Sequence, residues 1–212
     1  MSKIICVFGD SITEGHCDYE EGGWVNRLKK YLKSEGGVSV YNFGVSGDTT
    51  DGLLKRFDAE AEASNPEIII FAIGINDSAH IASKNENYVP VKKFAENLAA
   101  LSRKANAFTD KAVFVGITKV DEDKTAAISR DTDVSYRNKD IQGYDGAIKD
   151  FCEKNNLPFI EMYDLLDKED LEDGLHPNSA GHEKMFQRVK DFLIENKIIV
   201  GANGVRPFTK KT

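Results

Sequence analysis

A serine ends the first apolar run of this chain, where it can act as a nucleophile. The segment KIICVFGDSITEG covers Lys3–Gly15, and Ser11 follows the apolar residues directly after Gly9 and Asp10. A serine hydroxyl is a weak nucleophile that needs a base within hydrogen-bond reach. Ser11 is therefore a candidate nucleophile, although a turn serine or a helix cap fits the same position.

A base and a carboxylate to orient it occur together near the other end of the chain. Histidine takes and returns a proton near neutral pH, and an aspartate beside it fixes its tautomer. The segment DGLH supplies Asp173 and His176, so that one turn can bring their side chains together. Because Pro177 disfavours a helical backbone at His176, we expect an extended or turn geometry there, with a helix starting at Asn178.

Other polar residues near these positions compete for the same roles. His182 lies six residues after His176 without an aspartate three residues before it, so we expect a helix or surface residue. Asp10 is adjacent to Ser11, and adjacent side chains on an extended segment point apart. We therefore expect Asp10 and Asp77 to brace loops through hydrogen bonds.

Two further polar segments carry donors that suit the oxyanion of a tetrahedral intermediate. They are NFGVSGDTT at Asn42–Thr50 and GIND at Gly74–Asp77. Glycine lets a backbone N–H approach a ligand closely, and an asparagine amide is a neutral donor. Gly47 and Asn76 are the candidates, and the backbone N–H of Ser11 is a third.

Five short apolar runs predict the strands that position these segments. Several are apolar almost throughout, as expected of strands buried on both faces of a parallel sheet. Helical spacings between them indicate βαβ units, with helices on both faces of the sheet. The candidate residues then gather at the carboxyl ends of the strands, where such sheets bind ligands. The predicted strands are Ile4–Phe8, Val38–Phe43, Ile68–Ile73, Ala112–Ile117 and Pro158–Met162.

Two long polar segments, 78–90 and 119–140, match no helix or strand. Loops of this length in compact domains are often functional or mobile. We expect the tail at 197–212 to be an irregular strap or partly disordered. Histidines and tyrosines near the polar segments either are ordinary loop or core residues or line a substrate pocket. They are His16, His80, Tyr136 and Tyr144.

Composition limits the class of protein. The 212 residues suit one domain, 1–212, with a core of about 3–196, and the net charge of −7 argues against a general nucleic-acid binder. Cys6, Cys17 and Cys152 match no zinc pattern, and Cys17 is either a small buried residue or a reactive thiol near Ser11. No apolar run approaches the roughly 18 residues of a membrane span, and the N-terminus lacks a signal peptide's apolar region. We therefore expect a cytoplasmic protein.

Four segments of the chain together resemble the four blocks of the SGNH hydrolases, also called the GDSL lipase/esterase family. They are FGDSITEG, NFGVSGDTT, GIND and DGLHPN. The blocks occur in the family's order, and the resemblance extends from about Lys3 to Leu193. The resemblance implies a flavodoxin-like three-layer α/β/α sandwich with about five parallel strands. It implies Ser11 as nucleophile, His176 as base and Asp173 as its carboxylate. It also implies oxyanion donors at Ser11, Asn76 and Gly47, the last preferred to Gly44 because Gly47 aligns with the family's glycine.

The same resemblance implies a hydrolase of carboxylic esters that needs no metal or cofactor. An open site without an apolar lid favours short acyl groups such as acetyl. A thioesterase or lysophospholipase of the same family is the alternative enzyme, and a non-catalytic carbohydrate- or lipid-binding domain is the alternative from another class. The absence of GxGxxG and GxxxxGK[ST] patterns argues against a nucleotide-binding protein. The expected partner is a small-molecule ester, and the sequence does not indicate an oligomeric state.

Overall fold

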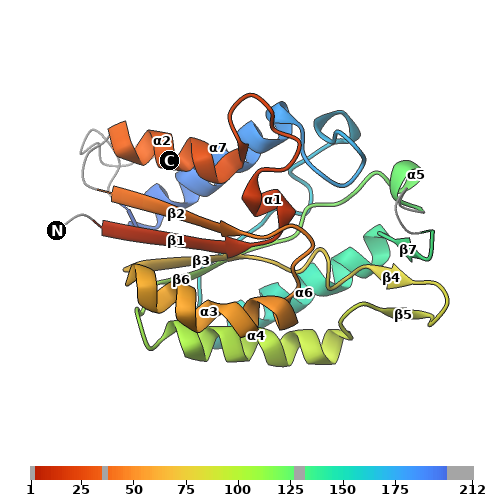
Figure 1. Cartoon of the computed structure of the whole chain (residues 1–212), viewed down its shortest axis with the longest axis horizontal. Helices are drawn as coiled ribbons and strands as arrows, with labels where there is room; N and C mark the ends of the chain where they lie inside the picture. The colour runs from red at the N-terminus through yellow and green to blue at the C-terminus, as the bar shows by residue number, and fades with distance from the viewer. Residues whose placement is uncertain (1–2, 35–37, 127–131, 200–212) are drawn as a thin grey trace, which may run out of the picture.

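Five parallel strands form the central sheet, in the order β2-β1-β3-β6-β8. In this computed structural model the described residues are 3–34, 38–126 and 132–199. Each predicted apolar run overlaps one strand of the sheet (Figure 1). The strands are β1 Lys3–Gly9, β2 Val38–Gly44, β3 Ile68–Ala72, β6 Ala112–Val115 and β8 Phe159–Ile160. The prediction of a five-stranded parallel sheet is confirmed.

The three central strands, β1, β3 and β6, are buried on both faces over most of their length, whereas β2 at the edge of the sheet is partly exposed. In β1 the side chains of Ile5, Val7 and Phe8 are all inaccessible to solvent. Phe8 contacts the ring of Phe57 on one of the covering helices, with centroids 4.8 Å apart, and the ring of Phe71 on β3, at 6.0 Å. Burial of such side chains is the main favourable term that holds the sheet and its helices together.

Helices cover both faces of the sheet, so the predicted three-layer sandwich is confirmed. Figure 1 shows α2 and α7 on one face and α3, α4 and α6 on the other. The Asn178 side chain accepts a hydrogen bond from the Gly181 N–H and caps α7, at the position predicted for the start of this helix. The covering helices are α2 Gly23–Ser34, α3 Thr50–Ser64, α4 Val91–Ala105, α6 Asn138–Asn155 and α7 Ser179–Glu195.

The two polar segments at 78–90 and 119–140 contain a small second sheet. It has the order β5-β4-β7 and is antiparallel. Its strands are β4 His80–Ile81, β5 Glu86–Asn87 and β7 Val134–Ser135, and the short helix α5 Glu122–Thr125 precedes β7. The expectation that these segments contain no regular element is therefore wrong in part, because strands of two residues are too short to show a periodic pattern. Residues 127–131 lie outside the described part.

The strand order changes direction between β1 and β3. The chain moves from β1 to β2 on one side and then crosses to β3 on the other, and ligands bind at such a reversal in α/β sheets. Gly9 at the end of β1 pairs with Gly44 of β2 and Ala72 of β3, so three of the polar segments leave the sheet side by side.

Among the described residues, no helix is long and apolar enough to cross a membrane. Residues 200–212, most of the tail that we expected to be irregular, lie outside the described part.

Candidate active site

Ser11 begins a four-residue helix, α1 Ser11–Glu14, directly after β1. The side chain of Asp10 caps this helix by accepting a hydrogen bond from the Ile12 N–H at 3.0 Å. The turn holds Ser11 at the carboxyl end of the sheet, where the residue is 6% exposed. The sequence segment that begins as a strand thus presents the serine at a strand-to-helix corner.

The loop before α7 brings His176 and Asp173 to Ser11. The Ser11 Oγ lies 2.9 Å from the His176 Nε2, although the two residues are 165 positions apart. The His176 Nδ1 lies 2.7 Å from the Asp173 Oδ2. The two hydrogen bonds form a continuous hydroxyl–imidazole–carboxylate chain, which is the geometry that activates a serine.

Asp173 is held as a carboxylate that orients the imidazole. Its Oδ1 accepts hydrogen bonds from the backbone N–H groups of His176, at 2.8 Å, and Leu175, at 3.0 Å. Partial burial raises the pKa of Asp173, but these bonds, the bond to the His176 side chain and the charge of His176 outweigh burial and leave the pKa well below its usual range. A carboxylate at Nδ1 favours the proton on that nitrogen, so Nε2 presents its lone pair to Ser11.

Asn76 lies in the turn after β3, with its amide fixed at both ends. Its Nδ2 donates to the backbone carbonyl of Asp48 over 2.9 Å, and its Oδ1 accepts from the Tyr136 hydroxyl over 2.9 Å. Because Oδ1 is held by Tyr136 and one Nδ2 hydrogen by Asp48, the second Nδ2 hydrogen has a defined direction. Asn76 is 9% exposed and can act as a preorganised donor.

Gly47 and Gly44 differ in what surrounds them. A Cβ at Gly44 would lie 2.1 Å from the Glu14 N, so Gly44 lets β2 approach α1 closely. Gly47 has a left-handed backbone, with a φ of 77°, and a Cβ added there would meet no atom within 4 Å. Across the described part of the chain, the backbone N–H groups of Gly47 and Ser11 have no hydrogen-bond partner. The packing thus gives Gly44 a structural role, whereas the role of Gly47 as an oxyanion donor stays a prediction.

The other two aspartates brace the turns, as expected. Asp77 accepts hydrogen bonds from the Thr50 N–H and hydroxyl at the start of α3, as Asp10 does at α1. Burial raises the pKa of Asp10 to about 7 and that of Asp77 to about 6, and their hydrogen bonds oppose this change only in part. Both therefore carry a free-energy penalty when ionised.

His182 lies in helix α7, one of the two expected alternatives, but it is fully buried and is not a surface residue. Its Nδ1 accepts from the Trp24 N–H at 3.3 Å, and its Nε2 lies 3.0 Å from the carbonyl oxygen of His16. Burial lowers the pKa of His182, so the neutral ring, with its proton on Nε2, connects α7 to α2 and to the segment after α1. Among the helical residues near the site, His182 therefore has a structural role.

The two remaining histidines, His16 and His80, have different surroundings. The ring of His16 packs edge-on against that of His176, with centroids 4.5 Å apart. His80 lies in β4 and pairs with Asn87 and Ser135 of the small sheet. The tyrosines differ in a similar way, because the hydroxyl of Tyr136 reaches Asn76 whereas that of Tyr144 donates to a backbone carbonyl at Val89.

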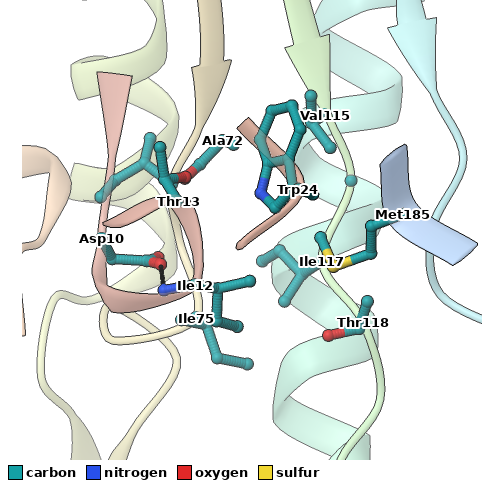
Figure 2. A pocket seen from close by; sticks show the side chains of 12 residues that line it. Asp10, Ile12, Thr13, Trp24, Ala72, Ile75, Val115, Ile117, Thr118 and Met185 are labelled. Atoms are coloured by element: carbon teal, nitrogen blue, oxygen red, sulfur yellow. Dashed lines mark hydrogen bonds between the residues drawn. The ribbon is translucent and has the colours of Figure 1, made fainter. Parts of the chain in front are cut away.

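A small internal cavity lies beneath the turn that carries Ser11. Figure 2 shows Asp10 and Ile12 on one side of it and Ile117 and Thr118 on the other. Its volume is about 30 Å³, the space of one or two water molecules. The interior next to this turn therefore has no room for a long acyl chain.

Sequence reasoning did not find Arg56, which supports the site from α3. Its guanidinium contacts the Asp48 carboxylate at 2.8 Å and donates to the Gly9 carbonyl at 3.1 Å, so it ties the ends of β1 and β2 together. An arginine on a predicted helix has no local signal for such a role. Arg56 and Asp48 come into contact only because the loop between β2 and α3 folds back onto the helix.

Comparison with known proteins identifies a family and similar esterases. The model of a GDSL-like lipase/acylhydrolase family matches residues 7–184. The esterase TesA from Pseudomonas aeruginosa is 32% identical over 117 residues, which are 55% of this chain and 55% of that protein. An arylesterase from Vibrio mimicus is 32% identical over 77 residues, 36% of this chain and 38% of that protein. These two alignments span about half of each relative or less.

Solved structures share the fold over nearly the whole chain. A lipase/acylhydrolase from Enterococcus faecalis has a TM-score of 0.73 at 24% identity, covering 90% of this chain and 95% of that chain. A variant of an acetylxylan esterase from Geobacillus stearothermophilus has a TM-score of 0.71 at 19% identity, covering 91% and 95%. The family match extends across the segments of Ser11, Gly47, Asn76 and His176, and it confirms the resemblance seen in the sequence. The chain belongs to the GDSL-like lipase/acylhydrolase family.

Proposed function

We propose that this protein is a serine hydrolase that cleaves carboxylic esters through an acyl-enzyme. The observation that carries the proposal is the pair of hydrogen bonds joining Ser11 Oγ, His176 and Asp173, at 2.9 and 2.7 Å. Esterases among the relatives and the structural neighbours support the same reaction class.

In the first half of the reaction, Ser11 Oγ attacks the ester carbonyl while the Nε2 of His176 takes the hydroxyl proton. The carboxylate of Asp173 stabilises the imidazolium that forms. The C–O bond to the alcohol then breaks, and His176 returns the proton to the leaving alcohol. In the second half, His176 removes a proton from a water molecule whose oxygen attacks the acyl carbonyl. The C–O bond to Ser11 Oγ then breaks, His176 returns the proton to Ser11 Oγ, and the carboxylic acid is released.

The oxyanion of each tetrahedral intermediate accepts hydrogen bonds from three groups. These are the backbone N–H groups of Ser11 and Gly47 and the second Nδ2 hydrogen of Asn76. Support for this assignment comes from the two N–H groups, which have no other partner among the described residues, and from the fixed amide of Asn76. Removal of one such donor in a comparable site costs about 10²–10³-fold in kcat.

We infer a preference for short acyl groups such as acetyl. The cavity of about 30 Å³ under the nucleophile turn cannot admit a long chain, so such a chain gains no burial there. A neighbour named acetylxylan esterase agrees with a small acyl group. A small-molecule ester is thus the proposed partner, and the cytoplasmic location stays a prediction.

A series of p-nitrophenyl esters tests the acyl preference. We expect kcat/KM to fall from acetate to butyrate to octanoate. A maximum at octanoate would overturn the short-acyl preference but leave ester hydrolysis in place. Preferential turnover of thioesters in competition would assign a thioesterase instead, and no turnover of any acyl substrate would favour a non-catalytic binding domain.

A further inference from the structure

Three side chains with metal-binding atoms meet at the candidate active site. One ligand atom from each of His16, Cys17 and His176 lies within 4.8 Å of the other two. Cys17 and His176 are buried, whereas His16 is exposed and opens the cluster to solvent. Two imidazoles and one thiol are the donor set that Zn²⁺ prefers in proteins.

The segment that carries His16 and Cys17 is held in place before any ion binds. The backbone N–H of His16 donates to the Ser11 carbonyl at 3.0 Å, and the carbonyl of His16 accepts from the buried His182 at 3.0 Å. The buried carboxylate of Asp18 accepts from the Gly23 N–H at 2.9 Å and closes the rest of this loop. The ligands therefore lie on a fixed backbone, which lowers the entropic cost of binding an ion.

The local charge favours a cation at this position. The carboxylates of Asp173 and Glu172 act electrostatically on Cys17. The same carboxylates would stabilise a divalent ion, which replaces the thiol proton when it binds.

We propose that His16, Cys17 and His176 form a zinc site that inhibits the enzyme. Zn–N and Zn–S bonds of 2.0–2.3 Å in a tetrahedral site place ligand atoms about 3.5 Å apart, so modest side-chain rotations close the cluster. The Nδ1 of His176 keeps its bond to Asp173, and Nε2 supplies the lone pair, an arrangement common at protein zinc ions. The Sγ of Cys17 binds as thiolate after its proton passes to solvent.

Inhibition follows because the ion and the reaction need the same lone pair. Zn²⁺ on Nε2 prevents His176 from accepting the Ser11 proton, so the nucleophile is not activated. This consequence rests on the proposed function, whereas the binding of the ion does not. Binding and inhibition are therefore measured separately.

Binding is measured on the full chain carrying Ser11→Ala, which keeps all three ligands and has no turnover. The chelator-treated protein is titrated with Zn²⁺ against a chromogenic chelator, and with Co²⁺ to detect thiolate-to-metal absorption. We expect one ion per chain and a thiolate band. Cys17→Ala should abolish the band. Cys17→Ala and His16→Gln should each weaken Zn²⁺ binding by more than about tenfold, because the loss of a residue that only supports a metal ligand already weakens binding by about that factor. Cys152 is a buried cysteine on α6, and Cys152→Ala is the matched control. It should change neither the thiolate band nor the affinity for Zn²⁺.

Inhibition is measured on the chain with Ser11 intact. Zn²⁺ should inhibit ester hydrolysis at the concentration at which it binds, chelator should restore activity, and Mg²⁺ should have no effect. Absence of stoichiometric Zn²⁺ binding, or equal binding by Cys17→Ala, would overturn the zinc site even if the protein is an esterase. Zn²⁺ binding by a protein that hydrolyses no ester would overturn the proposed function and leave the zinc site standing.

Discussion

The hydroxyl of Tyr136 donates a hydrogen bond to the Oδ1 of Asn76 over 2.9 Å. The two residues are 60 positions apart, and Tyr136 reaches Asn76 from the segment just after β7. The bond fixes the orientation of the amide, with Oδ1 toward Tyr136 and Nδ2 toward the Asp48 carbonyl. In the proposed mechanism Tyr136 is therefore a positioning residue that acts through Asn76.

Tyr136→Phe should lower kcat by about tenfold with little change in KM, because the Asn76 amide stays but loses one of its two hydrogen-bond anchors. This loss of kcat is smaller than the loss of about 10²–10³-fold expected for Asn76→Ala. Tyr144→Phe is the matched control, since its buried hydroxyl donates to the Val89 carbonyl and not to the site. Both variants should lose about 1 kcal/mol of unfolding free energy. Steady-state kinetics and chemical denaturation separate the two effects, and equal kcat values for both variants would argue against positioning by Tyr136.

Asp173→Asn should lower kcat by up to about 10⁴-fold, because an amide N–H facing Nδ1 favours the His176 tautomer with its proton on Nε2. That tautomer cannot accept the proton of Ser11. The control is Glu172→Gln, which removes the same charge from the exposed residue next to Asp173. Its kcat should stay within about twofold of the wild-type value. A full kcat in Asp173→Asn would mean that this carboxylate does not orient the base.

Gly47→Ala and Gly143→Ala form a matched pair, because a Cβ meets no atom within 4 Å at either position. At Gly47 the φ of 77° makes alanine cost about 1–2 kcal/mol of unfolding free energy, and the altered N–H direction should also lower kcat. In the interior of α6, Gly143→Ala should raise the unfolding free energy by about 0.5–1 kcal/mol and leave kcat unchanged. Denaturation and kinetics on both variants test the assignment, which would fail if Gly47→Ala kept full activity while losing stability.

Asp10 should make the protein less stable as pH rises. Its pKa is raised from 3.8 to about 7, first by burial, so between about pH 4 and pH 7 the folded state binds a proton that the unfolded state has released. The stabilisation is complete below pH 4 and is lost as pH rises through 7, with a slope of up to about 1.4 kcal/mol per unit. Asp10→Asn can still cap α1 and should flatten this part of the profile. Urea denaturation from pH 4 to pH 8 provides the comparison, and parallel profiles for both proteins would contradict the burial effect.

The fold was predictable because its three central strands, β1, β3 and β6, are buried on both faces. Runs such as Ile68–Ile73 have few polar residues, and their alternation with helical spacings determines the layers. The small sheet was not predictable, since β4, β5 and β7 have two residues each and depend on contacts between the segments 78–90 and 119–140.

The site was predictable where its residues lie in short segments at strand ends. Ser11 and Asn76 belong to segments that follow strands, and Asp173 and His176 share the short segment before α7. The structure brings Ser11, His176 and Asp173 together by hydrogen bonds. Partners that reach across the fold have no comparable signal. The burial of His182 was missed for this reason, because it depends on α2 packing against α7 and on the returning loop at His16.

Hydrolysis of p-nitrophenyl acetate by the wild type and by Ser11→Ala tests the central claim most directly, with Ser102→Ala on α4 as the control. The proposed mechanism predicts that Ser11→Ala lowers kcat by at least about 10⁴-fold while its circular dichroism spectrum and unfolding midpoint stay close to wild type. It also predicts an acetylated Ser11 peptide in rapidly quenched wild type. Equal turnover by wild type and folded Ser11→Ala would rule out the proposed mechanism, because it would show that the reaction does not pass through this serine.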